Sequence, residues 1–286
     1  MPTIDGLLLV DKPAGCTSHD VVAIARRALG VRRVGHGGTL DPFATGLLVL
    51  LVGRATRLLP YLEGEPKVYA GTIRFGAETD TDDGTGSVVR TAAGPDRAAV
   101  ERAMRGLTGD VQQLPPAYSA KQVAGQRAHA AARRGAPLAL PPATVTVHAW
   151  VVREWRADEV EVTVTCSGGT YVRALARDVG RAAGSAAHLA ALRRLRSGPF
   201  DVDSAATLDA LRAGTAAIRP LLAAVPSLPA VALEPDSVRQ VRQGRDVPAA
   251  GAGADRAALV DDAGTLVAIA QRDGAWWHPR TVLPNA

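Results

Sequence analysis

The alternation of hydrophobic and polar residues along the chain predicts a mixture of strands and helices. Strand-like runs occur at residues 6–10, 67–76, 144–155 and 159–166, and the last two are spaced as a hairpin. Apolar residues at helical spacing occur at residues 95–107 and 170–183. Thr17 and Asp20 form a capping-box signature that opens a helix ending near residue 29. The pattern favours an α+β protein.

A smaller module follows a proline-punctuated stretch at residues 220–229. It begins with a helix near residues 235–243. Three strands come next, near residues 257–260, 265–271 and 276–282, and turns separate them. The expected organisation is a large domain over residues 1–228 and a small β-rich domain over residues 229–286.

One segment of the large domain is irregular and carries candidate chemistry. Residues 35–46 read GHGGTLDPFATG, so four glycines and a proline surround His36 and Asp41. A residue before proline is pushed towards an extended conformation, which presents the Asp41 carboxylate from a loop. The apolar run at residues 47–52 predicts a buried element that holds this loop. A firmly held carboxylate suits a nucleophile or general base, and capping of a turn fits the same residue.

The residues that other kinds of catalytic or metal site require are missing from this stretch and its surroundings. An aspartyl phosphatase would carry a second acid two residues after Asp41, where Phe43 stands, and the Gly-Lys pair of a phosphate-binding loop does not occur in the chain. Residues 80–84, DTDDG, have the wrong offsets for a calcium loop and no closing glutamate. We therefore expect no metal site.

Composition narrows the class of protein. Hydrophobic residues make up 47% and charged residues 21% of 286 residues, which is typical of a globular protein. The longest strongly apolar stretch, residues 47–52, is far shorter than the roughly 20 residues that cross a bilayer. The N-terminus has an acid where a signal peptide would have cations, so we expect a cytoplasmic protein with no membrane partner. Cys16 and Cys166 are expected to be reduced and mostly buried.

The net charge of +5 belongs to the large domain, because residues 229–286 hold six arginines against seven acids. Two stretches are basic. Residues 115–142 hold Lys121, Arg127, Arg133 and Arg134 without an acid, and residues 168–199 hold six arginines against Asp178. Such stretches suit contact with phosphate groups, and a general bias towards arginine, which makes up 30 of the 33 basic residues, explains them as well.

The loop at residues 35–46 resembles the catalytic signature of the TruB family of pseudouridine synthases. Further motifs follow in family order at residues 6–13, 17–18, 67–69, 79–82, 115–121, 168–173 and 188–195. The resemblance spans residues 6–200. The chain departs from the family's signature at Gly37, where the family more often has threonine or serine. This difference bears on how stiff the loop is.

The resemblance implies a central mixed, largely antiparallel β-sheet flanked by helices, with a small C-terminal PUA-like module. It implies isomerisation of the uridine at position 55, in the T loop of tRNA, without a metal, another cofactor or a guide RNA. The C-terminal module would touch the acceptor stem, and we expect a monomer. The alternative is an RNA-binding or tRNA-folding protein that keeps the scaffold without modifying RNA.

The resemblance also assigns roles to residues. Asp41 would be the nucleophile, Arg173 would pair with it and keep it ionised, and Tyr69 would stack on the uracil and move a proton. The uridine must be flipped out of the tRNA, and His36 would fill the space it leaves. An RNA binder would not need Asp41, Arg173 and Tyr69 together, so their joint presence favours the enzyme.

Further residues would bind or support the substrate. Leu192 would form a wall of the pocket, and Tyr171 would support the site. Lys12 and Asp80 would position the loop or the RNA backbone, with a surface salt bridge as the alternative for each. The segment at residues 115–142 resembles the family's thumb, whose phosphate contacts would come from Lys121, Arg127, Arg133 and Arg134.

Overall fold

The computed structural model describes residues 4–62, 66–119, 122–123, 125–136, 138–249 and 253–284. Within these ranges no helix has the length and apolar character needed to cross a lipid bilayer. The chain divides into two compact units. The first comprises Met1–Pro42, Gly46–Gly64 and Gly198–Ala286, and the second comprises Phe43–Thr45 and Glu65–Ser197.

The first unit is built on two apolar strands. β1 (Gly6–Lys12) pairs antiparallel with β3 (Thr45–Val52), and nearly all of their side chains are buried. β14 (Ala206–Thr207) joins β1 in parallel, and β2 (Val34–His36) joins β3 antiparallel. Burial of both strands explains why residues 47–52 form a continuous apolar run rather than an alternating one.

Short helices surround this pair. α1 (Ser18–Leu29) begins at the predicted capping box, in which Thr17 and Asp20 bind each other's backbone N–H groups. The 3₁₀-helix η1 (Gly53–Tyr61) follows β3 directly. The remaining elements before the C-terminal module are β13 (Phe200–Asp201), η2 (Val202–Ser204), α5 (Leu208–Arg212) and η3 (Leu221–Ala224).

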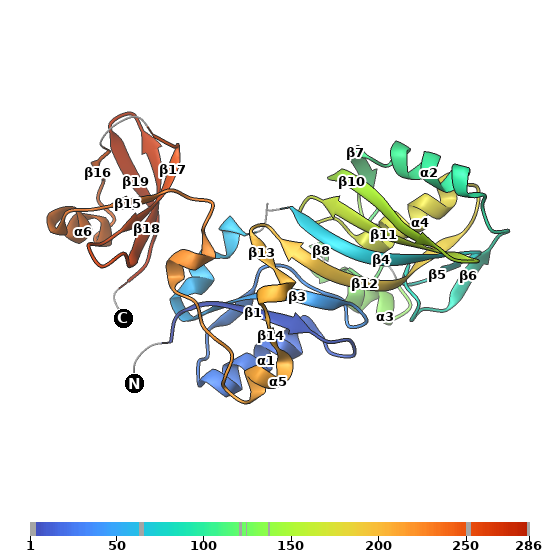
Figure 1. The fold of residues 1–286 in the computed structure, drawn as a ribbon, viewed down its shortest axis with the longest axis horizontal. Coiled ribbons are helices and arrows are strands. Elements are labelled where there is room, and N and C mark those ends of the chain that lie inside the picture. The colour runs from blue at the N-terminus through green and yellow to red at the C-terminus, as the bar shows by residue number, and fades with distance from the viewer. Residues whose placement is uncertain are drawn as a thin grey trace. The chain divides into compact units, whose positions relative to one another are not determined.

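The expected C-terminal β module is present and has its own apolar core. Its five strands lie in the order β15-β17-β18-β19-β16, beside the single helix α6 (Pro235–Arg242) described there (Figure 1). The strands are β15 (Ala230–Ala232), β16 (Val247–Pro248), β17 (Arg256–Val260), β18 (Leu266–Asp273) and β19 (Trp276–Val282). The end of β19 binds η1, where the Arg57 Nη1 atom donates to the Val282 carbonyl at 2.5 Å.

The second unit is an antiparallel sheet with helices on one face. Its strands lie in the order β12-β4-β11-β10-β7, and α2 (Arg97–Gly106) and α4 (Val172–Ala182) lie together beside them (Figure 1). The strands are β4 (Lys67–Phe75), β7 (Gly109–Gln113), β10 (Ala143–Trp155), β11 (Glu159–Cys166) and β12 (Ala187–Ser197). Alternate residues of β11 are buried, as one covered face requires. The predicted mixed, largely antiparallel α+β fold is confirmed.

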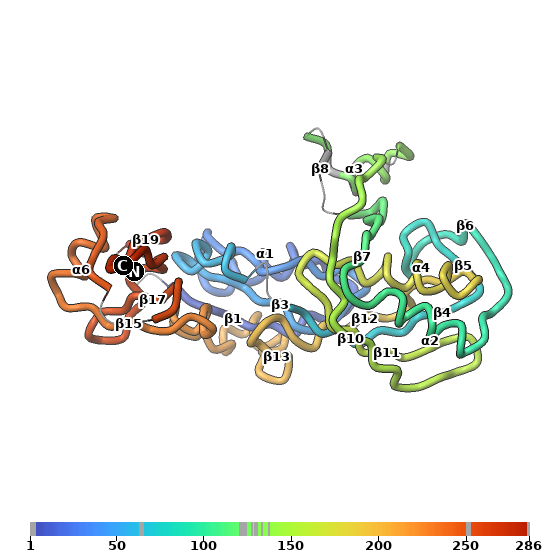
Figure 2. Tube along the Cα trace, turned by 90° about the horizontal axis from the view of Figure 1, so that it is seen from above, coloured from blue at the N-terminus to red at the C-terminus, as the bar shows by residue number. Residues whose placement is uncertain are grey.

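The alanine-rich run at about residues 119–134 of the basic segment predicts a helix, and this prediction is wrong over its first half. β8 (Gln122–Val123) and β9 (Gln126–Arg127) form a short ribbon, and only α3 (Ala128–Arg133) is helical. Gly125 lies in the turn between the two strands with φ of +78°, a conformation that glycine adopts without strain. Figure 2 shows α3 standing away from the strands of the sheet. A second ribbon, β5 (Ala77–Thr79) with β6 (Val88–Thr91), lies beside β12.

The two cysteines differ in environment, and this predicts a difference in reactivity. Burial in β11 raises the pKa of the Cys166 thiol to about 11, whereas Cys16 is partly exposed. Because the thiolate is the reactive form, we expect a thiol reagent at pH 8 to modify Cys16 readily and Cys166 only after unfolding in urea. Labelling of a Cys16→Ser variant in the folded state at the wild-type rate would contradict this.

Candidate active site

Asp41 lies half-buried between β2 and β3, and the residue before it is held by the start of α1. The Ser18 hydroxyl is 3% exposed and binds both polar backbone groups of Leu40. It accepts the Leu40 N–H at 2.8 Å and donates to the Leu40 carbonyl at 3.0 Å. The backbone that enters Asp41 therefore has a fixed position against the helix.

The residue after Asp41 is held from the end of β1. The Pro42 carbonyl accepts the Gly15 N–H at 2.8 Å and lies 3.5 Å from the Lys12 Nζ atom. Lys12 is completely buried, and its ammonium group also donates to the Cys16 carbonyl at 2.8 Å. A surface salt bridge does not describe Lys12, and its contacts are those of a residue that positions the loop.

The glycine at the family's threonine or serine position lies in a tight space. Gly37 follows His36, the last residue of β2, and its N–H donates to the Val49 carbonyl at 2.9 Å. A Cβ atom on Gly37 would lie 3.2 Å from the Cδ1 atom of Leu62. A larger residue there would require Leu62 to move, and the bond to β3 holds the loop in place.

In the second unit, Arg173 is buried rather than on the surface. It is the second residue of α4 and is 3% exposed. Its guanidinium donates to the Thr81 carbonyl at 2.6 Å and to the Tyr118 carbonyl at 2.9 Å. Its Nε atom lies 3.8 Å from the nearer carboxylate oxygen of Asp83. Contacts in several directions fix the plane of the guanidinium.

The other predicted site residues of this unit lie on the sheet or at the start of α4. Tyr69 is buried on β4, and Leu192 is buried on β12 opposite Gly71. Tyr171 immediately precedes α4, and its backbone N–H donates to the Gln113 side chain at 2.8 Å. The side-chain amide of Gln113 in turn donates to the Tyr171 carbonyl at 3.1 Å. Gln113 therefore ties the end of β7 to the start of α4.

The remaining predicted residues divide into two groups. Asp80 is exposed, and its carboxylate accepts the Ser87 N–H at 2.8 Å, which closes the loop between β5 and β6. Arg134 is exposed. Lys121 and the side chains of Arg127 and Arg133 lie outside the described residues, so their phosphate contacts stay predictions.

Two further arginines on the same helix as Arg173 were not singled out from the sequence, the buried Arg177 and the exposed Arg181. Arg177 and Arg181 follow Arg173 at four-residue spacing on α4. Arg177 binds the Asp82 carboxylate at 2.8 Å, and Arg181 binds the Glu78 carboxylate at 2.6 Å. The regular spacing of arginines in one predicted helix, with acids gathered at residues 78–83, was the available signal.

The pKa values of the two acids in these ion pairs shift in opposite directions, because Asp82 is more deeply affected by burial than Glu78. Burial raises the pKa of Asp82, and the positive charges of Arg177 and Arg173 oppose that rise. The hydrogen bond from Arg181 holds the pKa of Glu78 below its usual value. The positive charges of the arginines therefore oppose the effect of burial on the Asp82 carboxylate.

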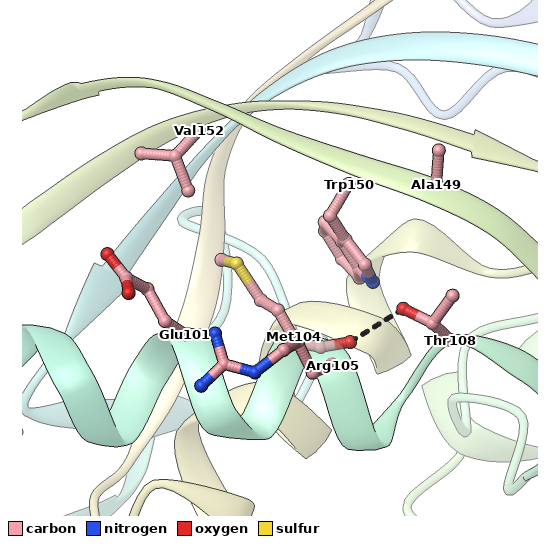
Figure 3. A pocket seen from close by; sticks show the side chains of 7 residues that line it. All are labelled: Glu101, Met104, Arg105, Thr108, Ala149, Trp150 and Val152. Atoms are coloured by element: carbon pink, nitrogen blue, oxygen red, sulfur yellow. Dashed lines mark hydrogen bonds between the residues drawn. The ribbon is translucent and has the colours of Figure 1, made fainter.

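The second unit has a hollow of about 420 Å³ near Pro95 and Trp155, which is lined by none of the predicted site residues, and two further hollows. One, of about 370 Å³, opens over β4, β11 and β12 and is lined in part by Leu192, Arg193 and Thr45. The other, of about 350 Å³, lies between α2 and β10 and is lined by Met104 and Val152, among others (Figure 3). It too is lined by none of the predicted site residues, so only the hollow over β4, β11 and β12 is associated with the candidate site.

Comparison with known proteins agrees with these residues. Residues 26–172 match the TruB family pseudouridylate synthase N-terminal domain, and residues 173–224 match the tRNA pseudouridylate synthase B C-terminal domain. This chain belongs to the TruB family. The tRNA pseudouridine synthase B of Arthrobacter sp. (strain FB24) is 44% identical to this TruB chain over 292 residues, covering 96% of this chain and 95% of the relative. That of Thermobifida fusca (strain YX) is 46% identical over 282 residues, covering 95% and 96%.

Solved structures share the fold of this TruB chain. The archaeal box H/ACA sRNP Nop10-Cbf5 complex contains a chain with a TM-score of 0.72 and 25% identity, covering 98% of this chain and 86% of that one. A structure of an H/ACA RNP bound to a substrate RNA containing 2′-deoxyuridine has the same TM-score at 24% identity, covering 98% and 85%. The predicted pseudouridine synthase fold is confirmed.

The contacts of Ser18 predict a measurable loss of stability in a variant. Ser18→Ala leaves the N–H and carbonyl of Leu40 without the hydroxyl, so we expect the free energy of unfolding to fall by about 1–3 kcal/mol. Urea unfolding measures this. The control is Ser204→Ala, which removes an exposed hydroxyl of the same unit that binds the Asp201 carbonyl at 2.9 Å. Equal midpoints for the two variants would show that Ser18 does not hold the loop.

Proposed function

We propose that this chain converts the uridine at position 55, in the T loop of tRNA, to pseudouridine, with Asp41 as the nucleophile. Membership of the TruB family makes the chain a tRNA pseudouridine synthase, which is an isomerase. The observation that carries the assignment of Asp41 is the support of its two neighbours, Leu40 by Ser18 and Pro42 by Gly15 and Lys12. A carboxylate on a fixed backbone is suited to attack at one defined atom.

The reaction balances without an outside electron donor. The bond from N1 of uracil to the ribose breaks, the ring turns, and a bond from C5 to the same ribose carbon forms. The proton lost from C5 is matched by one gained at N1, so substrate and product are isomers. A covalent bond to Asp41 divides this change into two easier steps. Attack on the ring and attack on the sugar carbon both suit a carboxylate.

The second unit supplies the proposed partners of the nucleophile. A guanidinium keeps a carboxylate ionised when water is excluded, and we assign this role to Arg173, whose orientation is fixed by Thr81 and Tyr118. Tyr69 would offer its ring to the uracil and act on a proton. Leu192 would form an apolar wall, and its place in the hollow over the sheet supports this.

The RNA must open its T loop to reach such a site. A flipped uridine leaves a gap in the stack, and we assign His36 to fill that gap. Phosphate contacts are assigned to Lys121, Arg127, Arg133 and Arg134 of the thumb segment. The exposure of Arg134 is consistent with this. The same proposal holds that the chain acts as a monomer in the cytoplasm, without a guide RNA. It also holds that the C-terminal module contacts the acceptor stem.

The first test replaces the nucleophile. Asp41→Asn keeps the shape of the side chain and removes its nucleophilic charge, so we expect no pseudouridine at position 55 while tRNA binding stays within about twofold of wild type. The assay uses an unmodified tRNA transcript in EDTA without guide RNA. Turnover by the variant at even about a percent of the wild-type rate would contradict the nucleophile role. If wild type binds the transcript without forming product, the chain is an RNA-binding protein or acts on another RNA.

The second test concerns the thumb segment. Replacing Arg127, Arg133 and Arg134 with glutamine should weaken tRNA binding and reduce the dependence of log Kd on log salt by about one for each phosphate that the variant no longer binds. Fluorescence titration at several salt concentrations measures both. The control is Arg212→Gln, which removes an exposed arginine paired with Asp209. An unchanged slope in the triple variant would exclude the phosphate role.

A further inference from the structure

Arg177 joins three parts of the second unit through one side chain. Its Nη1 atom donates to the Asp82 carboxylate at 2.8 Å, and its Nη2 atom donates to the Leu114 carbonyl at 2.9 Å. Its Nε atom donates to Asp178, the next residue of α4, at 2.9 Å. The Arg177 side chain is 8% exposed, and its bond to Asp82 is buried.

Arg173 and Arg177 bind the same two segments from adjacent turns of α4. Arg173 contacts the Thr81 carbonyl and the Asp83 carboxylate, and Arg177 contacts Asp82 between them. In the segment that leads into the thumb, Arg177 binds Leu114 and Arg173 binds Tyr118. The position of Arg173 is therefore coupled to that of Arg177 through both segments.

The backbone of Asp82 indicates that its carboxylate is held in place. Asp82 has φ of +59°, the one non-glycine residue with a positive φ among those described. Its N–H donates to the Thr79 carbonyl at 3.1 Å, and its own carbonyl accepts the Leu189 N–H at 3.1 Å. A backbone in this region persists where surrounding contacts determine it. Here those contacts direct the carboxylate to Arg177.

We propose that the Arg177–Asp82 ion pair is a positioning device that sets the orientation of Arg173 and ties the start of the thumb to it. This rests on the proposed role of Arg173 in the isomerisation. Neither residue of the pair touches the substrate, and both act through Arg173. Loss of the pair should therefore slow the reaction of bound tRNA more than it weakens binding.

The test separates rate from affinity. Arg177→Gln should lower the single-turnover rate at saturating enzyme by at least about tenfold, since small displacements of a catalytic group are costly, while Kd for tRNA changes by less than about threefold. The matched control is Arg181→Gln, on the same helix. Arg181 is bound to Glu78 of the same acidic segment and has 52% of its side chain exposed. We expect the control to keep the wild-type rate.

Two further variants distinguish positioning from charge balance. Arg177→Lys keeps a positive charge beside Asp82, but a lysine lacks the planar fork that binds Asp82 and Leu114 together. Compared with Arg177→Gln, it should therefore recover thermal stability more than it recovers the single-turnover rate. Asp82→Asn combined with Arg177→Gln should be no slower than Arg177→Gln alone, as expected for residues of one pair. If Arg177→Gln fails to fold, the comparison of single-turnover rate with tRNA affinity is made with Arg177→Lys and Asp82→Asn instead.

The outcomes are distinguishable. A wild-type rate in Arg177→Gln, an equal loss in Arg181→Gln, or full recovery of the rate in Arg177→Lys would overturn the positioning role and leave the proposed function standing. A wild-type chain that forms no pseudouridine would overturn the proposed function, and with it the role of the pair.

Discussion

The burial of arginine side chains is the constraint on which the second unit depends. A guanidinium does not lose its proton in a protein, so a buried one requires acceptors that come from elsewhere in the fold. For Arg173 and Arg177 these are carboxylates and carbonyls of residues 81–83 and 114–118. Both segments are irregular, and binding to the arginines determines their course. One helix thus supplies side-chain partners to two irregular segments, one of which also binds the backbone of Leu189 on β12.

The loop that contains Asp41 in the first unit is also irregular, and its backbone groups likewise require hydrogen-bond partners from elsewhere in the fold. Its support comes from Lys12, Gly15 and Ser18, which all lie between the end of β1 and the first turn of α1. Two motifs that are separate in the sequence, one near residue 12 and one near residue 41, therefore form one structural feature. A change in the first alters the position of a carboxylate in the second.

Local patterns predicted what local interactions determine. The capping box at Thr17 predicted the start of α1, and the apolar run at residues 47–52 predicted β3 as a buried element. Both elements depend on residues that are neighbours in the sequence. The alanine-rich composition of the thumb suggested one helix, where the turn at Gly125 divides the segment. Asp80 is assigned from the resemblance, and the sequence alone does not distinguish this exposed acid from the buried Asp82 two residues later. The pairing of Asp82 with Arg177 joins residues 95 positions apart, and no local spacing indicates it.

The fold alone does not determine how this enzyme selects its RNA. Chains in H/ACA complexes share it over 98% of the present chain at about 25% identity, so the sheet and the C-terminal module are common to both. Selection must depend on what is attached to the sheet. In this chain the segment leading into the thumb is bound by Gln113 to Tyr171 and by its carbonyls to Arg173 and Arg177. On the proposed function, a thumb that is fixed to the helix carrying Arg173 would couple its contact with RNA to the geometry around Arg173.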